Sequence, residues 1–209
     1  MIFIWGWRVR FRKVAEGVFF CQVCGGDREY HRKQGRRWIT IFFIPMIPLN
    51  SVGDEFVECT TCRNAYRLTV LNQPTSATLS ESLVGATRAA IVWLLRTGTP
   101  TGVPAPATVA AALQVLSAAA NRPWTEPELE ADVGQLDVNG LPAQLATLAG
   151  VLNDHGREGF LAGAARVAAA DRAITDAERA LLDNLAGALG MTPAHARGVI
   201  AQVVEQADI

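Results

Sequence analysis

Four cysteines, the only ones in the 209-residue sequence, restrict how the first third of the chain can fold. They form two Cys-x-x-Cys pairs, Cys21/Cys24 and Cys59/Cys62, which thirty-four residues separate. Such a pair places two sulfurs on one tight turn, and two such turns supply four thiolates at tetrahedral positions. The cysteines are therefore predicted to bind one Zn²⁺. Because four protein ligands leave no open coordination position, this zinc is expected to be structural rather than catalytic.

Disulfides, a redox-active pair and an iron–sulfur cluster are the alternatives to zinc. Residues 1–7 lack the length, basic leader and cleavage site of a secretory signal peptide, so an oxidising compartment is not expected. A redox Cys-x-x-Cys usually accompanies a βαβ pattern, which the surrounding sequence lacks. These points favour zinc and a cytoplasmic location.

Charge and composition divide the chain near residue 73. Residues 1–73 contain eleven Lys and Arg against six Asp and Glu, whereas residues 74–209 contain eight Arg, no Lys and fourteen acidic residues. Opposite charges on two halves indicate two domains. We predict a domain at residues 1–73, a linker at 74–80 and a second domain at 81–207. The most apolar run, residues 38–49, is too short to span a bilayer.

The first domain has strand patterns. Residues 1–14 alternate arginine with apolar and aromatic residues, which predicts a strand with Arg8, Arg10 and Arg12 on one face. Gln34-Gly35 predicts a turn, and residues 36–44 predict an apolar strand that Pro45 ends. A small antiparallel sheet held by the metal is therefore expected, since a domain of this size buries little core.

The second domain has only helical patterns. Pro and Gly residues divide it into successive segments, and Thr192 followed by Pro193 has the pattern of a helix start. We predict an all-α bundle with helices near residues 80–97, 105–120, 126–137, 141–154, 157–170, 176–189 and 193–206.

Two segments of this domain, fifty residues apart, resemble each other: residues 118–128 and 168–178 share Ala-Ala-Ala, Arg, Thr and Glu. Asp171 and Glu178 flank a turn in the second segment and are candidate ligands for a second cation. The alternative is a capping box, in which Thr175 and Glu178 satisfy each other's backbone amides at a helix start. Thr125 and Glu128 repeat this pattern in the first segment.

Basic residues of the first domain are candidates for binding nucleic acid or an acidic partner, because aromatic residues interrupt them. A solvated face, or a face docked on the acidic half, is the alternative. The candidate residues are Arg8, Arg10, Arg12, Arg32, Lys33, Arg36 and Arg37. Direct contact of Trp5, Trp7, Phe42 and Phe43 with a membrane or a membrane complex is a weaker hypothesis. The three histidines are scattered, and no phosphate loop, serine elbow or HExxH motif is present, so we do not expect an enzyme.

Both halves resemble known families. Residues 1–73 resemble bacterial zinc-ribbon proteins in the first Cys pair, in Arg36-Arg37-Trp38, in residues 42–49 (Phe-Phe-Ile-Pro-Met-Ile-Pro-Leu) and in the second Cys pair. Residues 80–207 look like the tellurite-resistance TerB-like helical domain in residues 167–178 and in the segment 188–191. The second resemblance implies an all-α repeat fold with an interaction or metal-sensing role in stress response, often near membranes.

Taken together, the sequence predicts an α+β protein in which a small antiparallel zinc ribbon precedes a TerB-like bundle. The expected function is that of a non-enzymatic, zinc-stabilised adaptor that binds an unidentified protein partner, with nucleic-acid binding by the ribbon as the alternative.

Overall fold

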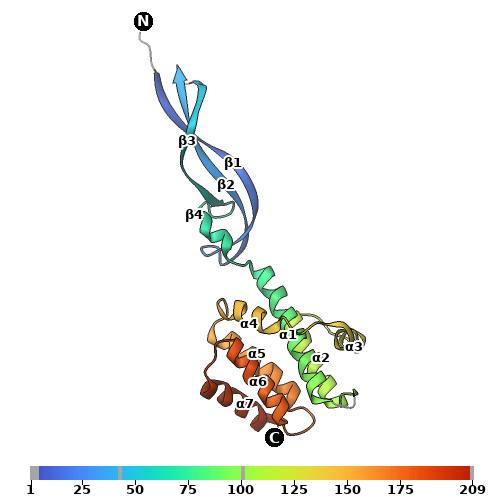
Figure 1. The fold of residues 1–209 in the computed structure, drawn as a ribbon. Helices are drawn as coiled ribbons and strands as arrows, with labels where there is room; N and C mark the ends of the chain where they lie inside the picture. The colour runs from blue at the N-terminus through green and yellow to red at the C-terminus, as the bar shows by residue number, and fades with distance from the viewer. Residues whose placement is uncertain (1–4, 42–43, 100–101, 208–209) are drawn as a thin grey trace. The chain divides into compact units, whose positions relative to one another are not determined.

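The structure is a computed structural model that describes residues 5–41, 44–99 and 102–207. In these ranges an antiparallel sheet comes first and seven α-helices follow, so the predicted α+β order is confirmed (Figure 1). The chain forms two compact units, Met1–Leu79 and Ser80–Ile209. Among the described residues, none of the helices combines the length and the apolar character needed to cross a bilayer.

Among the described residues, three long strands and one short strand make up the sheet, in the order β1-β2-β3-β4 with antiparallel neighbours. β1 pairs with β2 along its whole length, and only β4 is short. The strands are β1 (Trp5–Cys21), β2 (Gly26–Ile41), β3 (Ile44–Cys59) and β4 (Ala65–Arg67).

The turn predicted at Gln34-Gly35 is wrong, because β2 continues through these residues. The β2–β3 register shifts between Lys33 and Gly35, which is a β-bulge. Gly35 is buried, and a Cβ atom there would lie 2.7 Å from the carbonyl oxygen of Val52. The glycine therefore permits close approach of β3 rather than reversal of the chain.

The core of the sheet unit is small and surrounds the cysteines. Phe19 is 1% exposed, and its ring contacts Tyr30 and Tyr66 edge to face at centroid distances of 5.7 and 5.4 Å. A 3-10 helix, η1 (Leu68–Asn72), adds Val70 to this core. The buried members of the cluster are Phe19, Cys21, Val57, Cys59 and Val70.

Helix α1 (Ser76–Gly98) starts inside the segment 74–80. Its first turn lies in the sheet unit, where the carboxylate of Asp27 accepts hydrogen bonds from the amides of Ser76 and Ala77 at 2.9 and 3.1 Å. The bond from the Ser76 amide is the main cause that lowers the pKa of Asp27. Asp27 thus caps this helix from a position three residues beyond Cys24.

The remaining helices follow the predicted segments closely, with one exception. The boundary predicted between the helices at 141–154 and 157–170 is wrong, because the side chain of Asn153 accepts a hydrogen bond from the Gly156 amide at 2.9 Å and starts the second helix at Asp154. The helices are α2 (Pro106–Ala120), α3 (Glu126–Gln135), α4 (Leu141–Ala149), α5 (Asp154–Ala168), α6 (Asp176–Ala188) and α7 (Pro193–Ala207). Fully buried leucines fill the space between them, among them Leu116, Leu145, Leu161, Leu182 and Leu189.

Candidate metal centre

The two Cys-x-x-Cys turns have matching backbone geometry. The amide of Gly25 donates to the carbonyl of Cys21 at 2.9 Å, and the amide of Arg63 donates to the carbonyl of Cys59 at 3.1 Å. Gly25 and Arg63 both have left-handed backbone, with φ of 66° and 63°. Gly25 adopts this conformation without strain, because glycine has no Cβ atom. Arg63 adopts it with a side chain, which is uncommon for a residue other than glycine.

The four sulfurs gather at one point, with every pair of Sγ atoms within 4.8 Å. The Sγ atoms of Cys21 and Cys62 are 3.7 Å apart, and those of Cys24 and Cys59 are 4.0 Å apart. Tetrahedral Zn–S bonds of about 2.3 Å place ligand sulfurs about 3.8 Å from each other. The donor set and its spacing therefore fit a tetrathiolate metal ion. The described part of the chain has no second cluster of three or more potential ligands.

The cysteines are free thiols and differ in exposure. Cys21 and Cys59, the last residues of β1 and β3, are fully buried, whereas Cys24 and Cys62 on the turns are half-buried. The sulfur separations of 3.7 and 4.0 Å are far longer than the disulfide bond of about 2.05 Å. The four cysteines are thus reduced, and the two that end strands are more deeply buried than the two on the turns.

Tyr66 on β4 completes the site, and sequence reasoning missed it. Its hydroxyl lies 3.2 Å from Cys21 Sγ, within reach to donate a hydrogen bond to a thiolate. The signal that could have found it is an aromatic residue four positions after Cys62, on a strand that returns to the cluster. Ligand sulfurs commonly receive such outer hydrogen bonds, which orient them.

The thiols titrate unequally. Burial raises the pKa of Cys21, but hydrogen bonds from Tyr66, from the Cys24 amide and from neighbouring thiols outweigh burial and lower the pKa to about 6. Burial and hydrogen bonds with the other thiols raise the pKa of Cys24 to about 12. The hydrogen bond with Cys21, together with burial, raises the pKa of Tyr66 to about 12. One negative charge therefore forms readily in the cluster, and further thiolates require a cation to replace their protons.

The second predicted cation site, Asp171 and Glu178, faces an arginine. Arg172 Nη1 lies 3.2 Å from Glu178 Oε2 and 3.8 Å from Asp171 Oδ1. Glu178 is 4% exposed and also accepts hydrogen bonds from the amide and hydroxyl of Thr175, at 2.9 and 2.7 Å. The positive charge beside these carboxylates thus comes from the chain itself, and Glu178 closes a capping box.

The earlier segment has the same local structure. Thr125 and Glu128 form a capping box at the start of α3, and Arg122 pairs with Glu128 at 2.9 Å. Both segments therefore place an arginine six residues before the capping glutamate and pair the two. The resemblance in sequence is also a resemblance in local structure.

The predicted basic residues do not form one patch. Arg32 pairs with Glu55, and Lys33 pairs with Glu58 at 2.6 Å, so β3 neutralises both. Arg37 lies opposite Val9 in the β1–β2 register. The remaining four, Arg8, Arg10, Arg12 and Arg36, are exposed and belong to one face of the sheet.

The aromatic residues predicted to contact a membrane are described only in part. The Trp7 side chain is 60% exposed on β1. Phe42 and Phe43 lie outside the described residues, and so does the Trp5 side chain.

Comparison of the chain with protein-family models, with curated proteins and with solved structures finds no match. Functional conclusions therefore depend on the geometry of the chain's own residues.

Proposed function

We propose that the chain is a non-enzymatic, zinc-binding interaction protein, in which the metal is structural and the helical unit binds a protein partner. The observation that carries the proposal is the convergence of four thiol sulfurs, all within 4.8 Å, from two turns of matching geometry. Four soft sulfur donors at tetrahedral spacing favour Zn²⁺ over harder cations such as Mg²⁺ or Ca²⁺.

A structural role follows from the ligand count and from the position of the site. Four cysteine ligands would occupy every position of a tetrahedral ion and leave none for water or substrate. The cysteines also belong to the small core around Phe19 and Val57, so ligand bonds would hold together the ends of β1 and β3. Zinc binding would then stabilise the folded sheet unit directly.

An apolar hollow in the helical unit supports a protein partner. It measures about 320 Å³ and lies between α1, α2 and α3. Leu95, Val109 and Leu129 line it, and Val103 at its edge is 77% exposed. Leu95 and Leu129 are buried, so Val103 is the side chain that offers another protein an exposed apolar contact at the hollow. Glu126 and Glu130 also line the hollow, which favours a partner that combines an apolar side chain with basic neighbours.

The test compares partner capture by three forms of the full chain from cells of its own host. Val103→Asp places a charge in the hollow, and Val151→Asp places the same charge on a residue that is 45% exposed and does not line the hollow. We expect one protein to be retained by the wild type and by Val151→Asp but lost with Val103→Asp. Equal retention by all three forms would contradict this site.

Metal content of the same samples tests the other half of the proposal. We expect about one zinc per chain in all three forms, because neither valine lies in the sheet unit. Turnover of a substrate at the metal, with an exchangeable water ligand, would contradict a structural zinc.

A further inference from the structure

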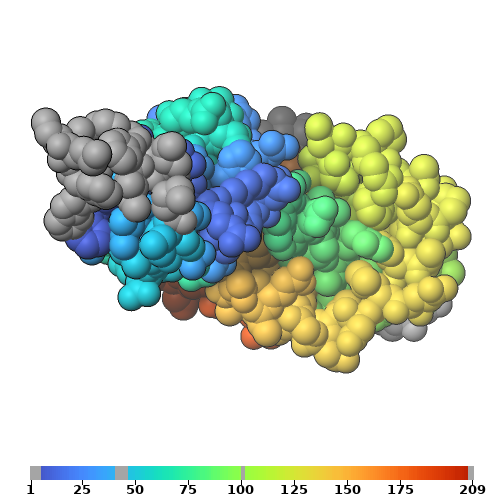
Figure 2. Space-filling model, turned by 90° about the horizontal axis from the view of Figure 1, so that it is seen from above, coloured from blue at the N-terminus to red at the C-terminus, as the bar shows by residue number. Residues whose placement is uncertain are grey.

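One face of the sheet carries four arginines from two neighbouring strands. Alternation along β1 directs Arg8, Arg10 and Arg12 to the same face. In the β1–β2 register Arg10 lies opposite Arg36, which places Arg36 on that face too. All four residues are exposed, and within the described ranges none of them forms an ion pair with an acidic side chain. We call this set the arginine face. In the space-filling view, β1 (deep blue) and β3 (cyan) reach the surface of the sheet unit (Figure 2).

The arrangement opposes stability. Like charges directly opposite each other on antiparallel strands repel, because their Cβ atoms are only about 4.5–5.5 Å apart. Arg10 and Arg36 form such a pair. Arg32 and Lys33, farther along β2, each have a glutamate partner from β3, so neutralising partners do occur in this sheet. An anion from outside the chain would relieve the repulsion that the fold leaves in place.

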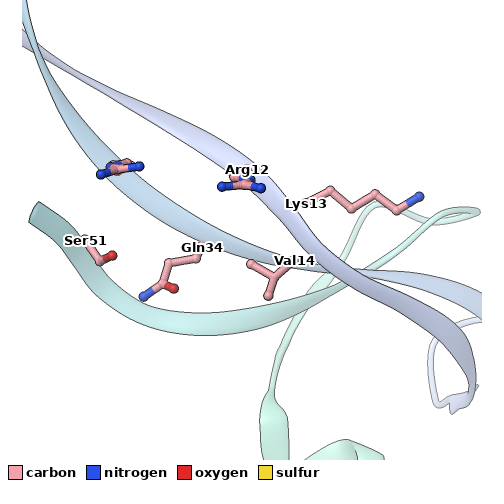
Figure 3. A pocket seen from close by; sticks show the side chains of 6 residues that line it. Arg12, Lys13, Val14, Gln34 and Ser51 are labelled. Atoms are coloured by element: carbon pink, nitrogen blue, oxygen red, sulfur yellow. The ribbon is translucent and has the colours of Figure 1, made fainter. Parts of the chain in front are cut away.

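Arg36 is held in position for such an anion. Its Nε donates a hydrogen bond to the carbonyl of Leu49 at 2.9 Å, which orients the guanidinium group. A hollow of about 310 Å³ lies beside it, and Arg12, Gln34 and Ser51 also line this hollow (Figure 3). Guanidinium, amide and hydroxyl groups together are the donors that commonly bind phosphate oxygens.

The shape of the arginine face favours a chain of phosphates over a lipid surface. Successive arginines on β1 are two residues apart, or about 7 Å, so the positive charges form a row. Trp7, Val9 and Phe11, which are exposed apolar residues of β1, alternate to the opposite face and could not enter a membrane together with the row, whereas Val14 lines the hollow beside Arg12. Trp38 lies opposite Arg8 on the arginine face and is half-buried, which leaves an aromatic surface beside the charges. Stacking of bases on aromatic side chains next to arginines is the usual way of binding single strands.

We propose that the arginine face binds single-stranded nucleic acid, with Arg8, Arg10, Arg12 and Arg36 on phosphates and Trp38 against a base. Binding is independent of sequence, because every proposed contact is to the backbone or to the face of a base. This inference goes beyond the proposed adaptor function, and it requires only a folded sheet unit, not a particular metal.

The test is fluorescence anisotropy of the full chain with a labelled single strand of roughly twenty nucleotides, a length that exceeds common site sizes. Four phosphate contacts predict that the logarithm of the association constant falls with the logarithm of the salt concentration with a slope of about −2.8 for a single strand. Affinity should therefore fall about 50-fold between roughly 50 and 200 mM salt. No binding at low salt would overturn the proposal.

Two double variants distinguish binding by the arginine face from binding that depends only on the net charge of the chain. Arg10→Gln with Arg36→Gln should reduce the salt slope to about −1.4. Arg37→Gln with Arg67→Gln removes the same charge from exposed residues outside the face and should keep the wild-type slope. Equal loss in both double variants would overturn the proposal, and so would binding to anionic vesicles without binding to the oligonucleotide. The melting temperature of the first double variant should stay close to that of the wild type, because the change removes a repulsive pair together with the hydrogen bond from Arg36 to Leu49.

Discussion

Replacement of Phe19 by alanine tests how far the sheet unit depends on its metal. Phe19 is 1% exposed and makes two edge-to-face contacts, with Tyr30 and Tyr66. Removal of a buried phenylalanine side chain costs about 3–5 kcal/mol of unfolding free energy. Each aromatic contact accounts for about 0.5–1.5 kcal/mol of that loss. A core in a unit of this size rarely supplies more than about 3–5 kcal/mol, so the metal-free variant should unfold in this unit.

Zinc should restore the fold of the variant, because structural zinc contributes about 10–16 kcal/mol in peptides that depend on it. Hydrogen exchange with mass spectrometry resolves the two units separately. With a chelator, peptides from residues 5–72 of Phe19→Ala should exchange fully, while those from the helical unit stay protected. With zinc, protection of both units should match the wild type.

Phe20→Ala is the matched control, since Phe20 is half-buried and lies outside the buried cluster. It should lose less protection in chelator than Phe19→Ala. The reasoning is refuted if chelated Phe19→Ala keeps wild-type protection, because the core would then not be marginal. It is also refuted if added zinc fails to protect residues 5–72 of the variant.

Three further predictions concern other residues. Glu178→Ala should lower the unfolding free energy of the helical unit by about 1–3 kcal/mol in chemical denaturation, because Arg172 and the Thr175 amide lose a buried partner. Added Ca²⁺ should leave the melting temperature of the wild type unchanged, because Arg172 already supplies the positive charge beside Glu178. Gly35→Ala should lower the melting temperature of the zinc-bound protein, because the added Cβ atom would lie 2.7 Å from the carbonyl oxygen of Val52 on β3. An unchanged melting temperature would show that β3 can move away from the added methyl group without loss of stability. The hydrogen bond from Arg122 is the main cause that lowers the pKa of Glu128 to about 2, so its stabilising effect is complete above the ordinary pKa of 4.5 and is lost as the pH falls toward 2. Glu128→Gln should therefore show a smaller loss of melting temperature between pH 5 and pH 2 than the wild type, and parallel curves would contradict this assignment.

The candidate metal centre was accessible from sequence because its determinants are local. Each Cys-x-x-Cys turn places its own two sulfurs, and the identical spacing of both pairs suggested that they meet. Tyr66 was not accessible, because its contact with Cys21 depends on the pairing of β4 with β3. Helix starts were predicted well where capping residues mark them, as at Thr175.

The sheet was predicted less well, because strand pairing is not local. Gln34-Gly35 has the sequence pattern of a turn, yet Gly35 lets β3 approach closely. This role can be recognised only when the β2–β3 register is known. For the same reason alternation predicted a common face for Arg8, Arg10 and Arg12, but not which basic residues acquire acidic partners. Arg32 is not available to bind an external anion because β3 places Glu55 beside it, and this pairing is visible only in the structure.

Native mass spectrometry of the full chain, purified without added metal, tests the central claim most directly. Four reduced thiols within 4.8 Å predict one bound zinc per chain, and loss of that mass from Cys21→Ser with Cys59→Ser. A wild-type mass with no metal, or a mass lower by the hydrogens that disulfide bonds remove, would contradict a tetrathiolate zinc centre.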